Sequence, residues 1–384
     1  MKNILYLPWL LIILVSCLRV SPDKETLSHA QNTAETKSDN EWLTIGGKKI
    51  NKYDEFGYYL LRNEYYLESE AENIVKVYLD MFSDDESGRR GGLDGIEKLI
   101  NLKKLYIVNA EMDTLDFSPL YTLRNLEEIG FSTRENNAFV FPDLSGLASR
   151  ESVSIIWIGS TGPTNLKNIE YLSNVNHVQI TGWNGYNFVL SGLEFLCQLD
   201  NLEQLEILNA YNSTFQIRDI ASLSKLKTLE LQFKEIDING IQRLGNLEYL
   251  NFNESEIQNI SVLSGLKNLI TLEIKIKEPE PDINFIEEMK SLQDLYILGE
   301  PKPTHSSDYH YDDSNYTADQ ILDLSIIGNL TQLNSLKLVG FVLKNIASLN
   351  NLNNIETVWV YNSILMDSTE STVKKLSWDS SYGR

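Results

Sequence analysis

The chain has 384 residues, of which 42% are hydrophobic and 23% charged, so it can bury a substantial core and wholesale disorder is excluded. Its net charge of −21 and pI near 4.6 disfavour nucleic acid and anionic lipid headgroups as partners, because both repel an acidic surface. Its two cysteines, Cys17 and Cys197, are too few for a disulfide framework.

The N-terminus has the pattern of a targeting segment. A short basic start precedes an apolar run over 4–15, which suits the central region of a signal peptide better than a membrane span. The run ends with the sequence LVSC at Leu14–Cys17, which resembles the bacterial lipobox. The resemblance implies cleavage after Ser16 and a lipid on Cys17. In enteric bacteria an Asp after the lipidated cysteine signals retention in the inner membrane, so Leu18 at this position favours the outer membrane by analogy. An ordinary signal peptide with an incidental cysteine is the alternative.

Two further segments precede the main body of the chain. After the predicted signal peptide, 1–16, the polar segment 17–40 is predicted to be a flexible tether. We expect 41–90 to cap the N-terminal end of the repeats that follow. Within this cap region, Trp42–Ile50 indicates a small hairpin around two glycines, and the aromatic-rich Asp54–Glu72 is expected to be partly helical.

From Asn101 onward one phrase recurs, and it consists of an aliphatic residue, two variable residues, an aliphatic, one variable residue and an aliphatic. Successive copies begin 21–27 residues apart, except for one interval of 41 residues. A fainter copy, Ile74-Val77-Leu79, precedes the series. The clear copies begin at Leu102, Leu126, Val153, Val175, Leu202, Leu226, Leu247, Leu269, Leu292, Leu333 and Ile355.

The spacing of the aliphatic residues predicts the structure of each repeat. Between phrases they occur at every third residue, as at Ile257, Ile260, Leu263 and Leu266. Such a step does not sustain an α-helical face, but it suits 3-10 turns. Within the phrase the alternation is that of a strand. We therefore predict an α/β solenoid with a parallel β-sheet on its concave face and short 3-10 or irregular return segments.

These residues resemble the short leucine-rich repeats, roughly 22 residues long, of internalin-type bacterial surface proteins. The resemblance covers 91–365 and implies a leucine-rich-repeat superhelix. That family places a buried Asn ladder three residues past the last aliphatic of the phrase. Here those positions hold residues such as Ala110, Ala210, Ser255 and Ser363, so the turns must satisfy their hydrogen bonds differently.

Three features fall outside the regular pattern. The long interval contains an insertion, 299–319, in which His305 and His310 stand among several Asp residues. Such residues can ligate a metal, but no strand or helix sets their spacing, so we predict a solvated loop and neither a metal site nor a cofactor. We expect 366–384 to form a tail that caps the far end loosely, and Cys197 to be a small buried apolar residue.

The variable positions of each phrase form two rows across the predicted sheet. The first row lies on the N-terminal side of the middle aliphatic and reads Lys104, Glu128, Ile155, His177, Gln204, Thr228, Tyr249, Thr271, Asp294, Ser335 and Thr357. The second row lies on the C-terminal side and reads Tyr106, Gly130, Trp157, Gln179, Glu206, Glu230, Asn251, Glu273, Tyr296, Lys337 and Trp359.

The second row is the predicted partner surface. Its aromatic residues lie toward both ends, and we expect them to be exposed because outward strand positions have no core to fill. Its Glu stripe suits a basic patch on a partner, although local packing and simple solvation are alternatives. The predicted partner-binding residues are Tyr106, Trp157, Gln179, Glu206, Glu230, Asn251, Glu273, Tyr296 and Trp359.

No catalytic constellation is evident, since the four His residues are scattered and no hydrolase, metalloprotease or P-loop motif occurs. We therefore predict a membrane-anchored protein of the bacterial cell envelope, at the outer membrane or cell surface, that is not an enzyme. It is predicted to bind a protein, or alternatively a glycan, through its concave sheet in adhesion or host contact. An envelope scaffold without a host ligand, or a divergent glycan-acting enzyme, are the other hypotheses.

Overall fold

The structure is a computed structural model, and it describes residues 42–53, 60–81, 92–108, 115–133, 138–148, 152–183, 188–252, 254–300, 302–303, 316–366 and 376–378. The predicted signal peptide, Cys17 and the tether lie outside these residues, so they stay predictions. The chain divides into two compact units. Unit 1 consists of 1–105 and 115–126, and unit 2 of 106–114 and 127–384.

Unit 1 begins with a hairpin. Strands β1 (Thr44–Ile45) and β2 (Lys48–Lys49) pair in antiparallel fashion. Gly46 and Gly47 form the turn with φ of +57° and +78°, a region that glycine enters without steric cost. The Trp42 ring packs edge-on against Tyr65 at a centroid distance of 5.8 Å. The predicted hairpin is therefore confirmed, and its one aromatic residue, Trp42, packs against a residue of a later strand.

The expectation that Asp54–Glu72 is partly helical is confirmed only at the C-terminal end of this segment. Strand β4 (Leu60–Tyr65) pairs in antiparallel fashion with β3 (Asn51–Tyr53), and helical structure begins only at the 3-10 helix η2 (Glu68–Asn73). Aromatic residues favour strands, and β3 supplies hydrogen-bond partners that the local sequence does not reveal.

The rest of unit 1 contains the first repeats. The faint early copy of the phrase is confirmed as strand β5 (Lys76–Asp80), in which Val77 and Leu79 are buried. Strand β6 (Lys104–Val108) carries the first clear copy and begins within this unit. The return segments are the 3-10 helices η3 (Ile96–Lys98) and η5 (Ser118–Thr122).

Unit 2 is built on one parallel sheet. Each strand pairs with the next, and equivalent phrase positions lie side by side. The aliphatic residues of the phrase point into the core, where Leu205, Leu229, Leu250 and Leu272 are fully buried. In chain order the strands are β7 (Glu128–Ser132), β9 (Ile155–Ser160), β11 (His177–Gly182), β13 (Gln204–Gln216), β14 (Thr228–Asp237), β15 (Tyr249–Phe252), β17 (Thr271–Lys275), β18 (Asp294–Leu298), β22 (Ser335–Val339), β24 (Thr357–Tyr361) and β26 (Leu376–Trp378).

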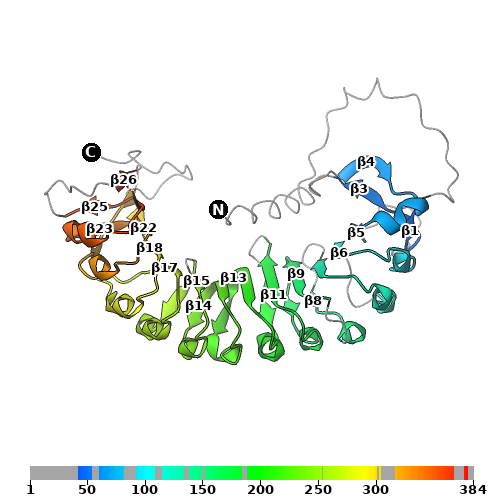
Figure 1. The fold of residues 1–384 in the computed structure, drawn as a ribbon, viewed down its shortest axis with the longest axis horizontal. Coiled ribbons are helices and arrows are strands. Elements are labelled where there is room, and N and C mark those ends of the chain that lie inside the picture. The colour runs from blue at the N-terminus through cyan, green and yellow to red at the C-terminus, as the bar shows by residue number, and fades with distance from the viewer. Residues whose placement is uncertain are drawn as a thin grey trace, which may run out of the picture. The chain divides into compact units, whose positions relative to one another are not determined.

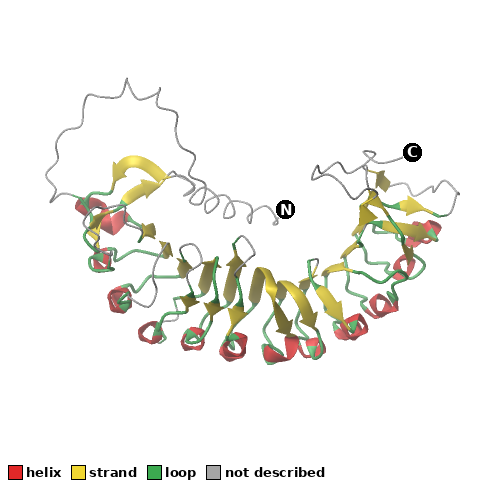
Figure 2. Ribbon diagram, turned by 180° about the vertical axis from the view of Figure 1, so that it is seen from behind, coloured by secondary structure: helices red, strands yellow, loops and turns green. Residues whose placement is uncertain are grey.

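The return segments of unit 2 contain 3-10 helices, as the three-residue spacing predicted. Within this unit the strands line the concave side and the helices the convex side (Figures 1 and 2). Several helices start after an Asn or Gly with positive φ, including Asn168, Gly192 and Gly240. The helices are η6 (Ser145–Leu147), η7 (Ile169–Tyr171), η8 (Leu193–Gln198), η9 (Ile217–Asp219), η10 (Ile241–Arg243), η11 (Ile260–Gly265), η12 (Asn284–Glu288), η14 (Ile327–Asn329) and η15 (Ile346–Asn351).

Many repeats contain a second strand segment that the sequence pattern did not predict. Between the phrase and the return helix, short parallel strands stack on their counterparts in neighbouring repeats, and the last residues of β13 and β14 pair in the same way. Large side chains such as Phe139, Phe233 and Phe341 lie in or beside these segments and are fully buried. The segments are β8 (Phe139–Val140), β10 (Thr164–Asn165), β12 (Leu190–Ser191), β16 (Glu256–Gln258), β21 (Gln320–Asp323), β23 (Phe341–Lys344) and β25 (Ile364–Leu365).

Serine residues make the turn hydrogen bonds where the expected Asn ladder is missing. The Ser255 hydroxyl accepts a hydrogen bond from the Phe233 amide at 2.9 Å and donates to the Leu231 carbonyl at 3.0 Å. Ser363 accepts from the Phe341 amide at 3.1 Å in the same manner. The prediction that these turns use other partners is therefore confirmed at these positions.

An Asn series also exists, but it lies just before the phrase. Asn246 donates its side-chain amide to the carbonyl of Ser224 in the preceding repeat at 2.7 Å, and Asn268 donates to Gly245 at 2.8 Å. Asn201 and Asn354 make equivalent bonds at 3.0 and 3.1 Å. These exposed contacts tie successive coils together at the start of each strand.

The insertion leaves the main sheet uninterrupted, because β18 pairs directly with β22. At its base, β19 (Lys302–Pro303) pairs in antiparallel fashion with β20 (Tyr316–Thr317), whereas 304–315, with both His residues, lie outside the described residues. In the predicted tail, β26 adds a strand beside β24. The expectation that Cys197 is buried is wrong, since its side chain is partly exposed; it lies off the three-residue spacing of the buried Leu193, Leu196 and Leu199.

Candidate functional site

The second row forms one continuous line across unit 2. Every member from Gly130 to Trp359 is the direct register partner of the next member. The first row runs alongside it, two residues earlier on each strand, and therefore lies on the same face of the sheet. We call the face that carries both rows the inner face. The structure therefore brings the predicted partner-binding residues of unit 2 together as the repeat pattern indicated.

The expectation that this row is exposed is wrong for several members. Tyr106 is 3% exposed, Glu206 and Asn251 are each 4% exposed, and Gln179 is 9% exposed. The remaining predicted residues, Trp157, Glu230, Glu273, Tyr296 and Trp359, are half-buried. Side chains that stand in register on neighbouring strands, about 4.8 Å apart, cover one another, and a repeat considered in isolation does not reveal this.

Tyr106 is held at one end of the row by close contacts. A Cβ atom added at Gly130 would lie 2.4 Å from Tyr106 Cδ1, so the absence of a side chain at this position makes room for the ring. The Tyr106 hydroxyl also forms a hydrogen bond with the carboxylate of Glu128 in the first row. Gly130 and Glu128 thus act together to bury a tyrosine that sequence reasoning expected to be exposed.

The centre of the inner face combines aromatic, imidazole and carboxylate groups. The rings of Trp157 and His177 lie 5.4 Å apart between centroids. His177 Nε2 approaches Glu206 Oε1 at 3.4 Å, which becomes an ion pair when the imidazole is protonated. On the far side of Glu206, Glu230 is its direct register partner. The two carboxylates therefore lie next to each other on a largely desolvated surface.

Burial and neighbouring charge both act on Glu230. Burial, followed by the charges of the nearby Glu206 and Glu273, raises the pKa of its carboxyl to about 7. Asn251 donates its amide to Glu230 Oε1 at 3.2 Å and to the Tyr249 hydroxyl at 3.3 Å. Burial, followed by the charge of Glu230, also raises the pKa of Tyr249. Acidic groups that repel one another are thus concentrated in the middle of the inner face.

Some buried polar atoms in this region have no partner among the described residues. The side-chain carbonyl of Gln179 accepts no hydrogen bond there, and the indole N–H of Trp183 donates none. His177 Nε2 makes no hydrogen bond within that part of the chain beyond its approach to Glu206. Buried polar groups are usually paired, and an exception often marks a place where a ligand or water completes the arrangement.

The opposite end of the row is less buried and carries mixed charge. Tyr296 and Ser335 bring their hydroxyls to 3.5 Å, and Lys337 and Trp359 follow along the row. Burial raises the pKa of Asp294, and a hydrogen bond from Thr271 opposes the shift. The acidic character is therefore concentrated between β13 and β17.

The described residues hold no group of three or more His, Cys, Asp and Glu side chains arranged to bind a metal. In the same part of the chain, no helix has the length and apolar character needed to cross a membrane. A pair of neighbouring carboxylates, one of which has a raised pKa, also occurs in glycosidases, but here Glu206 and Glu230 lie on a sheet among side chains that pack against them. The arrangement is suited above all to binding a complementary polar group.

Sequence reasoning did not single out His177, Tyr249 or Glu128, although all three lie in the first row and contact the second. The only indication in the sequence was that these three residues are large and polar and occupy positions next to the second row. The contacts of His177 and Glu128 follow from the register between repeats, whereas Tyr249 contacts Asn251 two residues along the same strand.

A scan against protein-family profiles and a search of curated proteins each gave no match. Solved structures do match. The TLR13–ssRNA13 complex has a TM-score of 0.50 and 16% identity, covering 73% of this chain and 38% of that chain. An internalin from Listeria monocytogenes has a TM-score of 0.44 and 17% identity, covering 79% of this chain and 91% of that chain. A leucine-rich-repeat protein from Leptospira interrogans has a TM-score of 0.34 and 16% identity, covering 81% of this chain and 97% of that chain.

At these identities the likeness concerns the fold alone, and this chain spans well under two thirds of the TLR13 chain. The recurring phrase, the parallel strands in register and the 3-10 return segments agree with that likeness. Together they identify the chain as a leucine-rich-repeat solenoid.

Proposed function

We propose that this protein binds a partner protein through the second row of its inner face. The observation that carries the proposal is the continuous register of that row from β7 to β24, which places aromatic residues at both ends and carboxylates between them. Half-buried side chains held by their neighbours lose little freedom on binding, and this favours affinity.

The charge of the chain supports a protein as the partner. TLR13 is a leucine-rich-repeat protein whose structure was solved with a single-stranded RNA, so the fold itself is compatible with nucleic acid. A chain with a net charge of −21 and a Glu-rich centre on its inner face repels phosphate groups. Tyr and Trp at the ends of the row are the residue types that dominate protein–protein hot spots.

The proposal includes a location in the bacterial envelope. The motif at Leu14–Cys17 supports lipidation of Cys17, which would anchor the protein through its N-terminus. We expect Cys17→Ser to move the protein from the membrane fraction to the soluble fraction. We also expect mild proteolysis of intact cells to release repeat peptides from the wild type. Protection from the protease until the cells are lysed would contradict surface exposure and favour a periplasmic scaffold.

The experiment that tests binding compares the wild type with Trp157→Ala combined with Trp359→Ala. The matched control is Tyr171→Ala, which removes an exposed ring from η7 on the convex side. Each protein is immobilised and panned against a displayed library of random peptides. We expect the double variant to lose at least about tenfold of the enriched binding, because aromatic hot spots each contribute strongly. Equal binding by the double variant would rule out the inner face as the binding surface.

A further inference from the structure

We propose that the centre of the second row, Gln179, Glu206 and Glu230, receives an arginine side chain of the partner. This inference rests on the proposed function and adds the chemical identity of the group that the inner face recognises. It follows from four properties of these residues, namely their register, an unused buried acceptor, uncompensated charge and an adjacent pair of rings.

The three residues present acceptors side by side. Gln179 is the register partner of Glu206, which is the register partner of Glu230. Neighbouring strands are about 4.8 Å apart, so a carbonyl and two carboxylates lie within reach of one planar group. A guanidinium has five N–H donors in a fixed plane and no acceptor, which matches a line of acceptors on adjacent strands.

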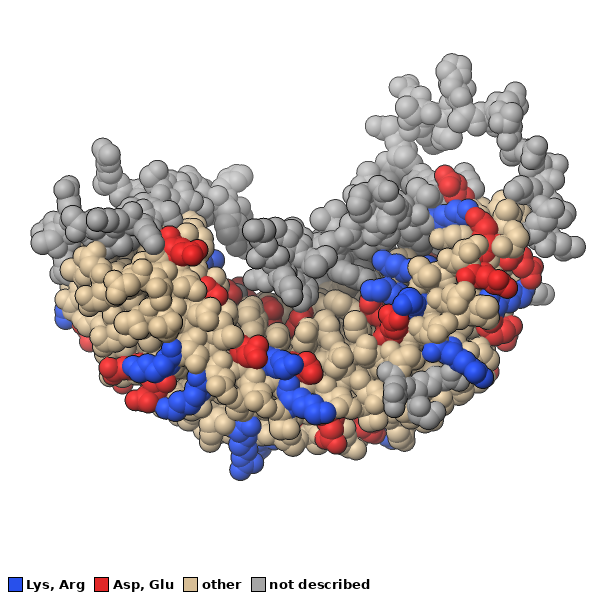
Figure 3. All heavy atoms as spheres, viewed as in Figure 1, with Lys and Arg blue, Asp and Glu red and all other residues tan. Residues whose placement is uncertain are grey.

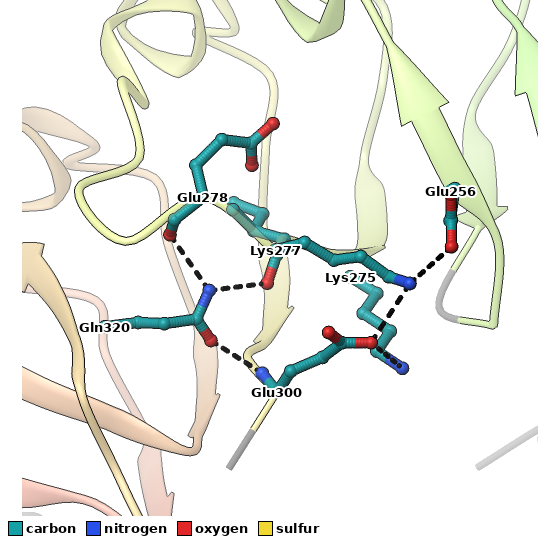
Figure 4. A network of polar contacts seen from close by, with 7 residues as sticks. Glu256, Lys275, Lys277, Glu278, Glu300 and Gln320 are labelled. Carbon is teal, nitrogen blue, oxygen red and sulfur yellow. Dashed lines mark hydrogen bonds and ion pairs between the residues drawn. The ribbon is translucent and has the colours of Figure 1, made fainter. Parts of the chain in front are cut away.

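The buried carbonyl of Gln179 independently indicates a missing donor. Gln179 is 9% exposed, and its Oε1 accepts no hydrogen bond from any described residue. Gln320 provides an internal comparison, because it is also buried yet fully bonded. Its amide donates to Ile276 and Glu278, and its carbonyl accepts from the Glu300 amide at 2.6 Å (Figure 4). This fold therefore does pair a buried glutamine where no ligand is required.

Apart from the approach of the His177 imidazole to Glu206 at 3.4 Å, the carboxylates of the centre are not paired with a basic side chain of the described residues. Elsewhere in unit 2, carboxylates pair with lysines, as Glu203 does with Lys227 at 2.8 Å and Glu256 with Lys277 at 2.6 Å. In the space-filling view, acidic and basic side chains are interspersed over the visible surface of the repeats (Figure 3). Within the described ranges, no Lys or Arg forms an ion pair with Glu206 or Glu230.

This missing cation has an electrostatic consequence. Burial and the neighbouring carboxylates raise the pKa of Glu230 to about 7, which means that its ionised form is destabilised. A guanidinium between Glu206 and Glu230 would reverse the repulsion and stabilise both carboxylates.

Two rings at the edge of the cluster favour arginine over lysine. Trp157 is the register partner of Gln179, and its ring lies 5.4 Å from that of His177. A guanidinium stacks on aromatic faces while its N–H groups bond in the plane, whereas an ammonium is a compact, strongly hydrated charge. The cluster thus offers rings that can stack on the plane of a guanidinium and acceptors that can bind the N–H groups at its edge.

The test titrates full-length protein with the capped tripeptides Gly-Arg-Gly, Gly-Lys-Gly and Gly-citrulline-Gly, monitored by calorimetry. Citrulline has the shape of arginine without its charge. We expect the arginine peptide to bind at least about tenfold more tightly than the citrulline peptide, and at least about threefold more tightly than the lysine peptide. Equal affinity for arginine and citrulline, or for arginine and lysine, would overturn the proposal.

Variants locate the binding event. Glu206→Gln and Glu230→Gln are each expected to weaken binding of the arginine peptide by about fivefold or more. Glu248→Gln removes the same charge from an exposed position immediately before β15 and should leave the affinity within about twofold. If both row variants bind as the wild type does, the inference is wrong. The peptide comparison uses the wild type, so it stays decisive even if a variant fails to fold.

The library experiment separates this inference from the proposed function. Arginine at a fixed position in the enriched peptides, together with loss of binding in Glu206→Gln, supports both. Enriched peptides that depend on Trp157 and Trp359 but contain no common arginine would leave the proposed function standing and overturn the inference. Peptides that bind independently of the inner face would overturn both.

Discussion

At the scale of single residues, the inner face shows how neighbouring repeats change the properties of a side chain. Glu230 occupies an outward strand position, yet its surroundings raise the pKa of its carboxyl to about 7. Tyr106 occupies an equivalent position and is nearly fully buried. In both cases the cause lies in side chains more than twenty residues away in sequence, such as Glu206 for Glu230 and Gly130 for Tyr106.

The raised pKa of Glu230 predicts a pH-dependent effect on stability. The folded protein holds this proton more tightly than the unfolded chain, so the contribution is present below the ordinary pKa of Glu, near 4.5, and is lost as the pH rises to about 7. Glu230→Gln removes this loss. We expect it to stabilise the protein by about 1–3 kcal/mol at pH 8 relative to its effect at pH 4.

Denaturant unfolding of the wild type and Glu230→Gln at both pH values measures this difference. The exposed Glu248→Gln is the control for loss of one negative charge, and it should show little dependence on pH. An effect of Glu230→Gln that is the same at pH 4 and pH 8 would contradict the assignment.

The contact between Gly130 and Tyr106 predicts a second effect. Gly130→Ala places a methyl group 2.4 Å from Tyr106 Cδ1, which forces the ring to move and disturbs its bond to Glu128. We expect a loss of about 1–3 kcal/mol of stability, measured by thermal unfolding. Gly245→Ala is the matched control, because its added Cβ would meet nothing within 4 Å. Similar stability of the two variants would show that the ring adapts without cost.

At the scale of elements, polar side chains hold together segments that the repeat pattern treats as loops. Gln320 starts β21 and bonds to the backbone of Ile276, Glu278 and Glu300, which precede and follow β18 (Figure 4). Beside it, Lys275 and Lys277 both approach Glu300 at 3.1 Å. The end of the long insertion is thereby fastened to the preceding repeat.

Loss of the Gln320 amide is expected to be costly. Gln320→Leu keeps the approximate volume but leaves buried backbone groups without their partners, so we expect a loss of about 2–4 kcal/mol. The control Gln332→Leu changes an exposed glutamine on the following turn and should alter stability by less than about 0.5 kcal/mol. Chemical denaturation measures both, and equal stabilities would show that these hydrogen bonds contribute little.

At the scale of the whole molecule, the sheet of unit 2 continues directly across the insertion. Strand β18 pairs with β22 residue for residue, and Pro303 and Tyr316 are partners at the base of the insertion. Replacing 304–315 with an Asn-Gly turn should therefore preserve the solenoid and change its stability by less than about 1 kcal/mol, because loop-closure entropy depends weakly on length.

Circular dichroism and thermal unfolding of this shortened protein check the expectation. Deletion of Gln320–Asp323, which forms β21, is the contrasting variant, since it removes a strand that pairs with β23. We expect a large fall in the melting temperature for that deletion alone. A comparable fall for the loop replacement would indicate that 304–315 are needed for folding.

The repeating phrase by itself determined the fold class, the parallel direction of the strands, the 3-10 return segments and the membership of the second row. These follow from local periodicity, because a three-residue step and an in-out alternation each allow few backbone conformations. The tertiary structure decided which row residues are buried, where the second strand segments and the Asn series lie, and how the carboxylates of Glu206 and Glu230 influence each other. Burial and charge coupling depend on atoms that neighbouring coils bring together, and that proximity arises only when the repeats stack.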